Sequence, residues 1–359
     1  MSTAYDRPGT DELEISLFGP GYGESLVVHY GNNRWFTVDS CLEDDRVTPT
    51  AIAYLRRLGV DAARFVTHNV ITHPDGDHIG GISALFDACE TATLVCPVVL
   101  TEKQMLSYVS VYARTDPTPL TQTTRELHNV LKKSTERPPG LPLYVKQDTR
   151  FIDCSSVRVT ALAPSDSKIH TFLTRVSLQV PMAKADRRAP GQLLPNDVSA
   201  ALLFEAGSFA AVFGADLEES PGQGWTTILE NSVAFRNAER PGVFKVAHHG
   251  SRNADCAELW RAMSRPVAIL SPFKRGSIKI PTGGDIARIN SYTKAGYSTS
   301  SFRSIRMKRL SRVDQVLRRH NIRRQALYPK NGHVRLRINL AGIVSVKLFG
   351  EAVRLSDVY

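Results

Sequence analysis

Short apolar runs alternate with amphipathic stretches along most of the chain, and this alternation predicts an α/β fold. The N-terminal part predicts a strand at 14–18, followed by a hairpin with strands at 26–30 and 34–38 around a Gly-Asn turn. Further strands are expected at 64–71, 94–96, 151–163, 200–204, 209–213, 243–247, 266–270, 334–340 and 343–349. Several of these strands stop abruptly at a polar side chain, which indicates where chemistry could lie.

Helical periodicity fills most intervals between the strands. The first helix is expected at 48–58, with Thr48 as N-cap, Pro49 in the first turn and Gly59 just after the end. Further helices are expected at 82–88, 225–237, 254–263 and 284–290, the last one capped by Thr282.

Two segments depart from this alternation. Residues 101–150 contain expected helices at 102–112 and 124–133, which form either a substrate lid or a surface elaboration without function. Residues 164–195 are polar and poorly periodic, and we expect a mobile loop there.

The most informative stretch runs from residue 69 to residue 81 and reads N-V-I-T-H-P-D-G-D-H-I-G-G. Four potential metal ligands follow a buried strand within six positions: His73, Asp75, Asp77 and His78. Imidazole and carboxylate groups clustered in this way suit one or two divalent cations. A polar loop that holds these residues by chance is the alternative, but the preceding strand, the spacing and the trailing glycines all favour a site.

The same arrangement of an apolar strand followed by a potential ligand occurs three more times. Asp39, Asp216 and the pair His248-His249 each follow the end of an expected strand. In layered α/β folds, sites lie where successive strands end on one edge of a sheet. We therefore expect these distant residues to meet residues 73–78 at one edge.

Composition narrows the compartment and the substrate. The five cysteines are scattered without a C-x-x-C pair, no apolar run approaches the ~20 residues of a membrane helix, and no signal peptide is recognisable at the start. These features predict reduced thiols, a cytoplasmic location and no membrane partner. Residues 301–340 hold twelve Lys or Arg and one acid, whereas the net charge of the whole chain is +10. A basic block in an otherwise near-neutral chain favours a polyanionic partner, although a solvated helix face is an equal alternative.

The pattern T-H-P-D-G-D-H-I-G-G, then G-A-D, then H-H-G-S resembles the metallo-β-lactamase fold hydrolases, in order from about residue 13 to residue 272. Within that superfamily the chain looks most similar to the hydrolase domain of the competence DNA-uptake channel (ComEC-like) proteins. The resemblance implies an α/β fold, a four-layer αββα sandwich, here with a helical insertion at about 101–150. Residues 1–12 are expected from their polarity to form a loose tail. The basic C-terminal extension at 273–359 carries no motif of the family, and its expected hairpin of 334–340 and 343–349 would complete the sheet.

The resemblance also implies roles for individual residues. His73 and Asp75 would bind one cation, Asp77 and His78 a second, and Asp216 would bridge the two. His248 would complete the second position, which leaves His249 to face the substrate as a proton donor; the opposite assignment of these two histidines stays open. The supporting residues implied are Asp39, Asn196 and Ser199.

Two departures from the family pattern concern the first cation position. Asp75 stands where the family usually has a second His, and no His matches the usual third motif, where Asn196, Asp197 and Ser199 stand instead. These changes make the first position richer in oxygen. Zn²⁺ is the expected cation, and Mn²⁺ is the alternative.

The resulting hypothesis is a metal-dependent hydrolase that cleaves phosphodiester bonds, most of all in DNA or RNA, with Asp77 and His249 as catalytic residues. The basic block would hold the phosphate backbone, with Tyr292, Tyr297 and Phe302 nearby for stacking. The phosphate-binding candidates within it are Arg318, Arg319, Arg323 and Arg324. One alternative is a phosphodiesterase for cyclic nucleotides or another small phosphodiester. Another is a binding or assembly module that keeps a weakened metal site.

Overall fold

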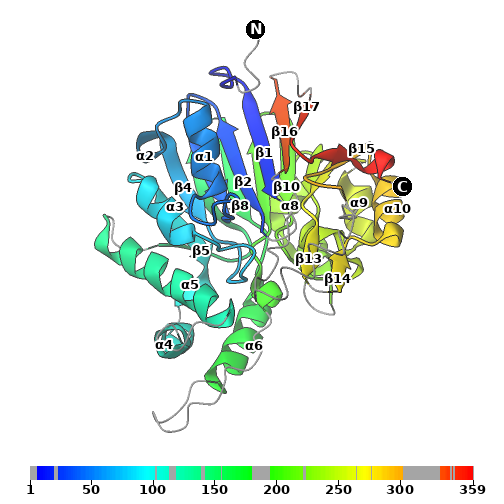
Figure 1. Cartoon of the computed structure of the whole chain (residues 1–359). Helices are drawn as coiled ribbons and strands as arrows, with labels where there is room; N and C mark the ends of the chain where they lie inside the picture. Colours follow the sequence, from blue (N-terminus) through cyan, green and yellow to red (C-terminus); the bar gives the residue numbers. More distant parts are fainter. Residues whose placement is uncertain are drawn as a thin grey trace, which may run out of the picture.

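Two eight-stranded sheets pack face to face and form the centre of the molecule (Figure 1). The structure is a computed structural model that describes residues 6–19, 23–101, 103–112, 119–138, 142–154, 156–179, 195–220, 224–263, 265–275, 277–301, 332–339, 342 and 344–358. A further hairpin, formed by β13 Phe273–Arg275 and β14 Ile278–Ile280, stands apart from both sheets.

The first sheet has the strand order β17-β16-β1-β2-β3-β4-β5-β6. Its strands β3 to β6 run parallel, whereas β1, β2, β16 and β17 pair antiparallel. The bounds are β1 Leu13–Gly19, β2 Ser25–Tyr30, β3 Trp35–Val38, β4 Val66–Val70, β5 Thr93–Pro97, β6 Leu143–Val145, β16 Gly332–Ile338 and β17 Val344–Phe349.

The second sheet has the strand order β18-β15-β12-β11-β10-β9-β8-β7. Its strands β10, β11, β12 and β15 run parallel, and β7 to β10 form an antiparallel meander. The bounds are β7 Thr149–Cys154, β8 Val157–Ala161, β9 Leu202–Ala206, β10 Phe209–Phe213, β11 Val243–Lys245, β12 Val267–Leu270, β15 Ala295–Ser298 and β18 Val353–Arg354.

Helices cover the outer face of each sheet. On the first sheet they are α1 Thr50–Arg57, α2 Ala62–Phe65, α3 Ile82–Ala88, α4 Lys103–Tyr112, α5 Pro119–Glu136 and α6 Asp166–Ser177. On the second sheet they are α7 Trp225–Asn231, α8 Val233–Asn237, α9 Ala257–Met263 and α10 Gly283–Tyr292. None of the helices in the described ranges is both long and apolar enough to cross a membrane.

Three apolar cores correspond to the three interfaces of a four-layer sandwich. One core joins the first sheet to its helices, a second lies between the sheets, and a third joins the second sheet to its helices. Phe36 and Phe204 illustrate the middle core, because they come from different sheets and their ring centroids lie 6.1 Å apart. The expected αββα arrangement is therefore confirmed.

The predicted pattern of elements is correct in most places, but strands β6, β13, β14, β15 and β18 were not expected. Four further details differ. Helix α1 begins at Thr50 with Pro49 as N-cap, because the Thr48 hydroxyl donates to Asp45 at 2.6 Å instead of capping the helix. Residues 62–65 form α2, so the strand expected at 64–71 is shorter. The helix expected at 225–237 is divided at Ser232, whose side chain caps α8.

The fourth difference is α6, which occupies part of the segment expected to be a loop. Its many polar residues favour a loop in the sequence, but Phe172 and Val176 are buried against the helices of the first sheet. Residues 180–194 of that segment lie outside the described residues. The expected cap of the last helix is confirmed, since Thr282 and Asp285 form a capping box at the start of α10.

The C-terminal segment is built into the first sheet. Strand β16 pairs with β1 over its whole length. On the outer face of that pair, Arg337 forms an ion pair with the fully buried Glu14 at 2.5 Å, and Glu14 also accepts from the Tyr54 hydroxyl at 2.5 Å. This buried polar network ties the last strands and helix α1 to the N-terminal strand.

Candidate metal centre

The candidate ligands gather where parallel strands of both sheets end. Strands β3 and β4 from the first sheet deliver Asp39 and residues 72–78, and strands β10 and β11 from the second deliver Asp216 and His249. The Ala200 amide donates to the Thr72 carbonyl at 2.9 Å and links the two sheets at this point. The expectation that separated strand ends would meet at one edge is therefore correct.

Four side chains form a compact group that could hold a cation. Each of Asp77, His78, Asp216 and His249 offers one ligand atom, and these atoms all lie within 4.8 Å of one another. His249 Nε2 lies 3.1 Å from Asp77 Oδ2, and His78 Nε2 lies 3.3 Å from Asp216 Oδ1. All four residues are buried. We call this group the His/Asp cluster.

Second-layer acceptors orient both histidines of the cluster. His78 Nδ1 donates to Asp39 Oδ2 at 2.8 Å, and His249 Nδ1 donates to the Ser271 carbonyl at 2.8 Å. Asp39 is fixed in turn by the Thr72 amide and hydroxyl, at 2.8 and 2.7 Å. With Nδ1 carrying the proton, the Nε2 lone pairs of both rings face the cluster, as metal-binding histidines require.

A left-handed turn decides which of the two adjacent histidines points inward. After β11, the residues His248, His249 and Gly250 have φ values of 45°, 55° and 85°. Such a run is strained for residues other than glycine, and strain of this kind gathers at functional sites. It buries His249 in the cluster and leaves His248 at the rim, where its side chain is 17% exposed. The geometry therefore favours His249 as the ligand, not His248 as expected from the sequence.

His73 lies beside the cluster and is fully buried. Its ring centroid is 4.2 Å from that of His78, and its Nδ1 lies 3.1 Å from the Ser199 hydroxyl. The same hydroxyl accepts from the Asp216 amide at 3.1 Å, so Ser199 lies between His73 and Asp216. His73 Nε2 is buried without a hydrogen-bond partner, which leaves a lone pair available.

Asp75 and Asn196 do not enter the His/Asp cluster. Asp75 is only half-buried and accepts from the Gly76 amide at 2.7 Å. The Asn196 amide group donates to Glu218 at 2.9 Å and lies 3.4 Å from His248 Nε2. His248, Asn196 and Glu218 thus form a polar rim around the cluster.

Two charged residues at the base of the cluster were not predicted from the sequence. Lys245, on β11, is fully buried, forms an ion pair with buried Glu24, and donates to the Ala215 carbonyl at 2.9 Å. Its Nζ lies 3.9 Å from Asp216 Oδ1. Glu24 Oε1 lies 3.8 Å from His78 Nδ1. The sequence does contain an indication of this ion pair, namely a single lysine inside the apolar run V-F-K-V-A. Because an unpaired charge is rarely buried, a lysine in a buried strand predicts an acidic partner.

The electrostatics of the cluster favour positive charge at its centre. Burial by itself would lower the pKa of His249, but Asp216, Asp77 and Glu24 raise this pKa to about 10. Burial also opposes protonation of His78, yet the carboxylates of Asp216, Asp77 and Asp39 hold its pKa well above the usual value. In contrast, burial and the charge of His78 lower the pKa of His73 to about 3.

The residues present therefore fit a divalent cation. Carboxylates and imidazoles converge, and His73 Nε2, His78 Nε2 and Asp216 Oδ1 are buried without hydrogen-bond partners. A cation in the cluster would give His78 Nε2 and Asp216 Oδ1 a partner and would replace the protons that the carboxylates otherwise attract, whereas His73 Nε2 lies outside this ligand group.

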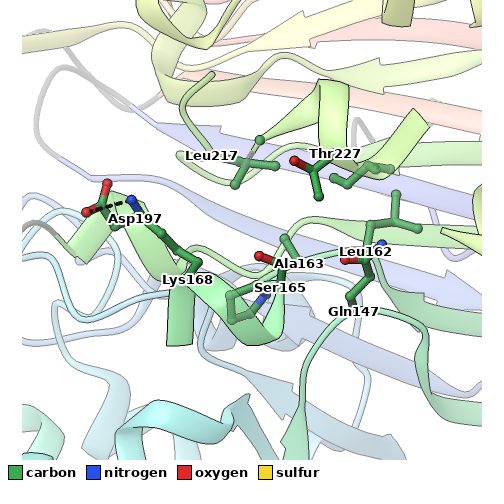
Figure 2. A pocket seen from close by; sticks show the side chains of 11 residues that line it. Gln147, Leu162, Ala163, Ser165, Lys168, Asp197, Leu217 and Thr227 are labelled. Carbon is green, nitrogen blue, oxygen red and sulfur yellow. Dashed lines mark ion pairs between the residues drawn. The ribbon is translucent and has the colours of Figure 1, made fainter. Parts of the chain in front are cut away.

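A small pocket lies behind the rim, between the start of α6, the end of β8 and α7 (Figure 2). Lys168 and Asp197 form an ion pair across 3.0 Å at one side of it. Its cavity volume of about 10 Å³ has room for roughly one water molecule. It is therefore too small for a substrate and is separate from the His/Asp cluster.

The arginines proposed to bind phosphate, Arg318, Arg319, Arg323 and Arg324, lie outside the described residues, as does Phe302. Tyr292 packs against Trp260 with stacked rings 5.6 Å apart, and Tyr297 is buried in the core between the sheets. Tyr297 is therefore not placed to stack on a nucleic-acid base, whereas Tyr292 is half-buried.

Solved structures similar to this chain are metallo-β-lactamase fold proteins. A metallo-β-lactamase with an HARLDQ motif from Cronobacter sakazakii shares 14% identity over 56% of this chain and 55% of its own, with a TM-score of 0.32. The subclass B3 enzyme MEM-A1 from a soil metagenome library shares 16% identity over 72% of this chain and 83% of its own, with a TM-score of 0.35. Zn²⁺-bound PqqB from Methylobacterium extorquens shares 12% identity over 68% of this chain and 58% of its own, with a TM-score of 0.32.

The match spans about half the length of the Cronobacter enzyme. No protein-family model matches the chain, and no curated protein matches its sequence. At these identities and TM-scores the similar structures carry no argument about the substrate.

Proposed function

We propose that this chain is a metal-dependent hydrolase of phosphodiester bonds, with nucleic acid as its substrate class and the cytoplasm, where its five thiols stay free, as its location. The observation that carries the proposal is the buried His/Asp cluster, in which Asp216 presents both carboxylate oxygens to histidines. Oδ1 lies 3.3 Å from His78 Nε2, and Oδ2 lies 3.5 Å from His249 Nε2. A carboxylate held in this way can serve two cations, and two-cation sites are suited to phosphoryl chemistry.

Asp77, His78, Asp216 and His249 would hold one divalent cation, with Zn²⁺ expected and Mn²⁺ as the alternative. His73 would turn toward a second, oxygen-rich position, to which Asp75 could add a carboxylate. A bound cation supplies Lewis acidity and lowers the pKa of water. Asp39 and the Ser271 carbonyl keep the two cluster histidines in the tautomer that such binding needs.

We assign the proton-donor role to His248 rather than to His249. His248 is partly exposed at the rim, and its Nδ1 lies 3.2 Å from Glu218 Oε1. His248 Nε2 lies 4.0 Å from Asp216 Oδ2, at the edge of the cluster. His249 is committed on both nitrogens, because Nδ1 contacts the Ser271 carbonyl and Nε2 faces the proposed cation position beside Asp77.

The test is hydrolysis by metal-free protein to which Zn²⁺ or Mn²⁺ is added back. The panel contains single- and double-stranded DNA, RNA, cyclic nucleotides and bis(4-nitrophenyl) phosphate. Cleavage of the polynucleotides, absent with EDTA and absent in Asp77→Ala, is expected. Cleavage of cyclic nucleotides alone would point to a small-molecule phosphodiesterase. Stoichiometric metal without cleavage of any member would point to a binding module.

A further inference from the structure

We propose that the β13–β14 hairpin is an arm that holds the phosphate backbone of a nucleic-acid strand beside the His/Asp cluster. The hairpin consists of β13 Phe273–Arg275 and β14 Ile278–Ile280. In Figure 1 it lies just below α9 and α10. This inference rests on the proposed function for its substrate class, but it concerns a separate surface and a separate measurement.

Both ends of the hairpin are anchored to the turn that carries His249. At the first end, the Ser271 carbonyl accepts from His249 Nδ1, and the Phe273 ring stacks on the His249 ring with centroids 5.2 Å apart. At the second end, the side chain of Pro281 lies beside Gly250. The hairpin therefore rises directly from the wall of the cluster and cannot move far from it.

Helix α10 fixes the same connection from behind. Arg288, on that helix, donates to the Gly250 carbonyl at 2.8 Å and pairs with Asp285 at 2.8 Å and with Asp255 at 3.3 Å. These are acidic residues close to the hairpin in the fold, and both are already engaged by Arg288. Neither of them forms an ion pair with the hairpin among the described residues.

The hairpin carries positive charge in an arrangement that is unfavourable without a partner. Lys274 and Lys279 are exposed and stand directly opposite each other in the antiparallel register. Like charges at such a pair of positions repel and destabilise a strand pair. Neither lysine forms an ion pair with any residue in the described ranges, and residues 271–284 contain three basic residues and no acidic one.

A polyanion would neutralise the two opposed lysines of the hairpin better than a small anion bound at the cluster. One phosphodiester at the cluster has neighbours along the same strand, and those neighbours can lie against Lys274 and Lys279. Phosphate contacts of this kind position a strand without reading its sequence.

The experiment compares Lys274→Gln/Lys279→Gln with a control, Lys294→Gln. Lys294 is equally exposed, but it precedes β15 at the opposite end of the parallel strands, where its amide donates to the Pro266 carbonyl. Binding of a fluorescent single-stranded oligonucleotide is measured by anisotropy in EDTA at several salt concentrations. Each lost contact should reduce the slope of log affinity against log salt by about 0.7.

The expected result is a slope reduced by about 1.4 in the double variant and unchanged in the control. In the metal-loaded protein, KM for the oligonucleotide should rise while kcat, and the turnover of bis(4-nitrophenyl) phosphate, stay unchanged. An unchanged slope, or an equal loss in Lys294→Gln, would overturn the proposal. So would a loss of binding to anionic lipid vesicles with oligonucleotide binding intact.

The two proposals can fail separately. If the wild-type protein hydrolyses no phosphodiester but the slope still falls in the double variant, the catalytic proposal fails and the hairpin remains a nucleic-acid arm. If the wild type and the double variant hydrolyse bis(4-nitrophenyl) phosphate equally and have the same slope of log affinity against log salt, the hairpin inference fails and the catalytic proposal stands. The midpoint temperature of thermal unfolding of the double variant should equal or exceed that of the wild type, because removing the two opposed charges relieves their repulsion.

Discussion

The buried pair of Lys245 and Glu24 at the base of the cluster allows a quantitative test of the structure. Lys245→Met keeps most of the volume of the side chain but leaves the Glu24 carboxylate buried and without its cation. The Ala215 carbonyl also loses the donor that lies 2.9 Å away. Breaking a buried ion pair from one side costs about 3–5 kcal/mol, so the free energy of unfolding should fall by about that amount.

The complementary variants separate the pair from its surroundings. Glu24→Gln alone should also be strongly destabilising, because Lys245, fully buried, would then lack its counter-charge. Lys245→Met/Glu24→Gln removes both charges and should lose clearly less than the sum of the single variants. We expect a coupling free energy of about 2–3 kcal/mol, the upper part of the range for residues in contact.

The assay is urea unfolding followed by circular dichroism, with EDTA in every sample so that metal binding does not contribute. Lys294→Met, at an exposed lysine, is the control and should unfold near the midpoint of the wild type. A double variant whose loss equals the sum of the single losses, within about 0.5 kcal/mol, would refute the interaction that the structure shows.

Three further changes test the cluster, its framework and the core between the sheets. Asp77→Ala should abolish metal-dependent turnover and lower the bound metal measured by elemental analysis while circular dichroism stays native; full activity would contradict the proposed ligand set. Gly214→Ala places a Cβ 2.8 Å from the Ala247 Cβ, so it should lower the free energy of unfolding in urea by about 1–3 kcal/mol. The matched control is Gly242→Ala, whose added Cβ meets only a ring atom at 3.9 Å. An equal loss of stability in both variants would contradict the close packing at Gly214. Burial lowers the pKa of His68 to about 4, so the folded state binds fewer protons than the unfolded state. The free energy of unfolding should therefore fall by up to roughly 3 kcal/mol as the pH drops from about 6.5 to 4. In urea unfolding His68→Gln should show a weaker pH dependence of stability, and a pH dependence identical to that of the wild type would count against the low pKa.

The sequence was sufficient for features that depend on neighbouring residues. Strand and helix periods, the capping box at Thr282 and the ligand spacing of residues 73–78 are local patterns, and the structure has them where expected. The recurrence of polar residues after apolar strands also located Asp39 and Asp216, since parallel strands place their carboxyl ends at one edge. Helix α6 was missed because only two of its residues, Phe172 and Val176, are fully buried and its apolar signal is correspondingly weak.

Only the tertiary structure decided which groups complete the cluster. The choice between His248 and His249 depends on three successive left-handed residues, and no local pattern separates two adjacent histidines. The Glu24–Lys245 pair joins β11 of one sheet to the residue just before β2 of the other. Because both residues are buried, each charge needs the other as its counter-charge. The sequence by itself thus determined the strand ends and the types of ligand they carry, whereas the packing of two sheets determined which atoms meet, because contacts between distant segments arise only when their backbones are fixed relative to each other.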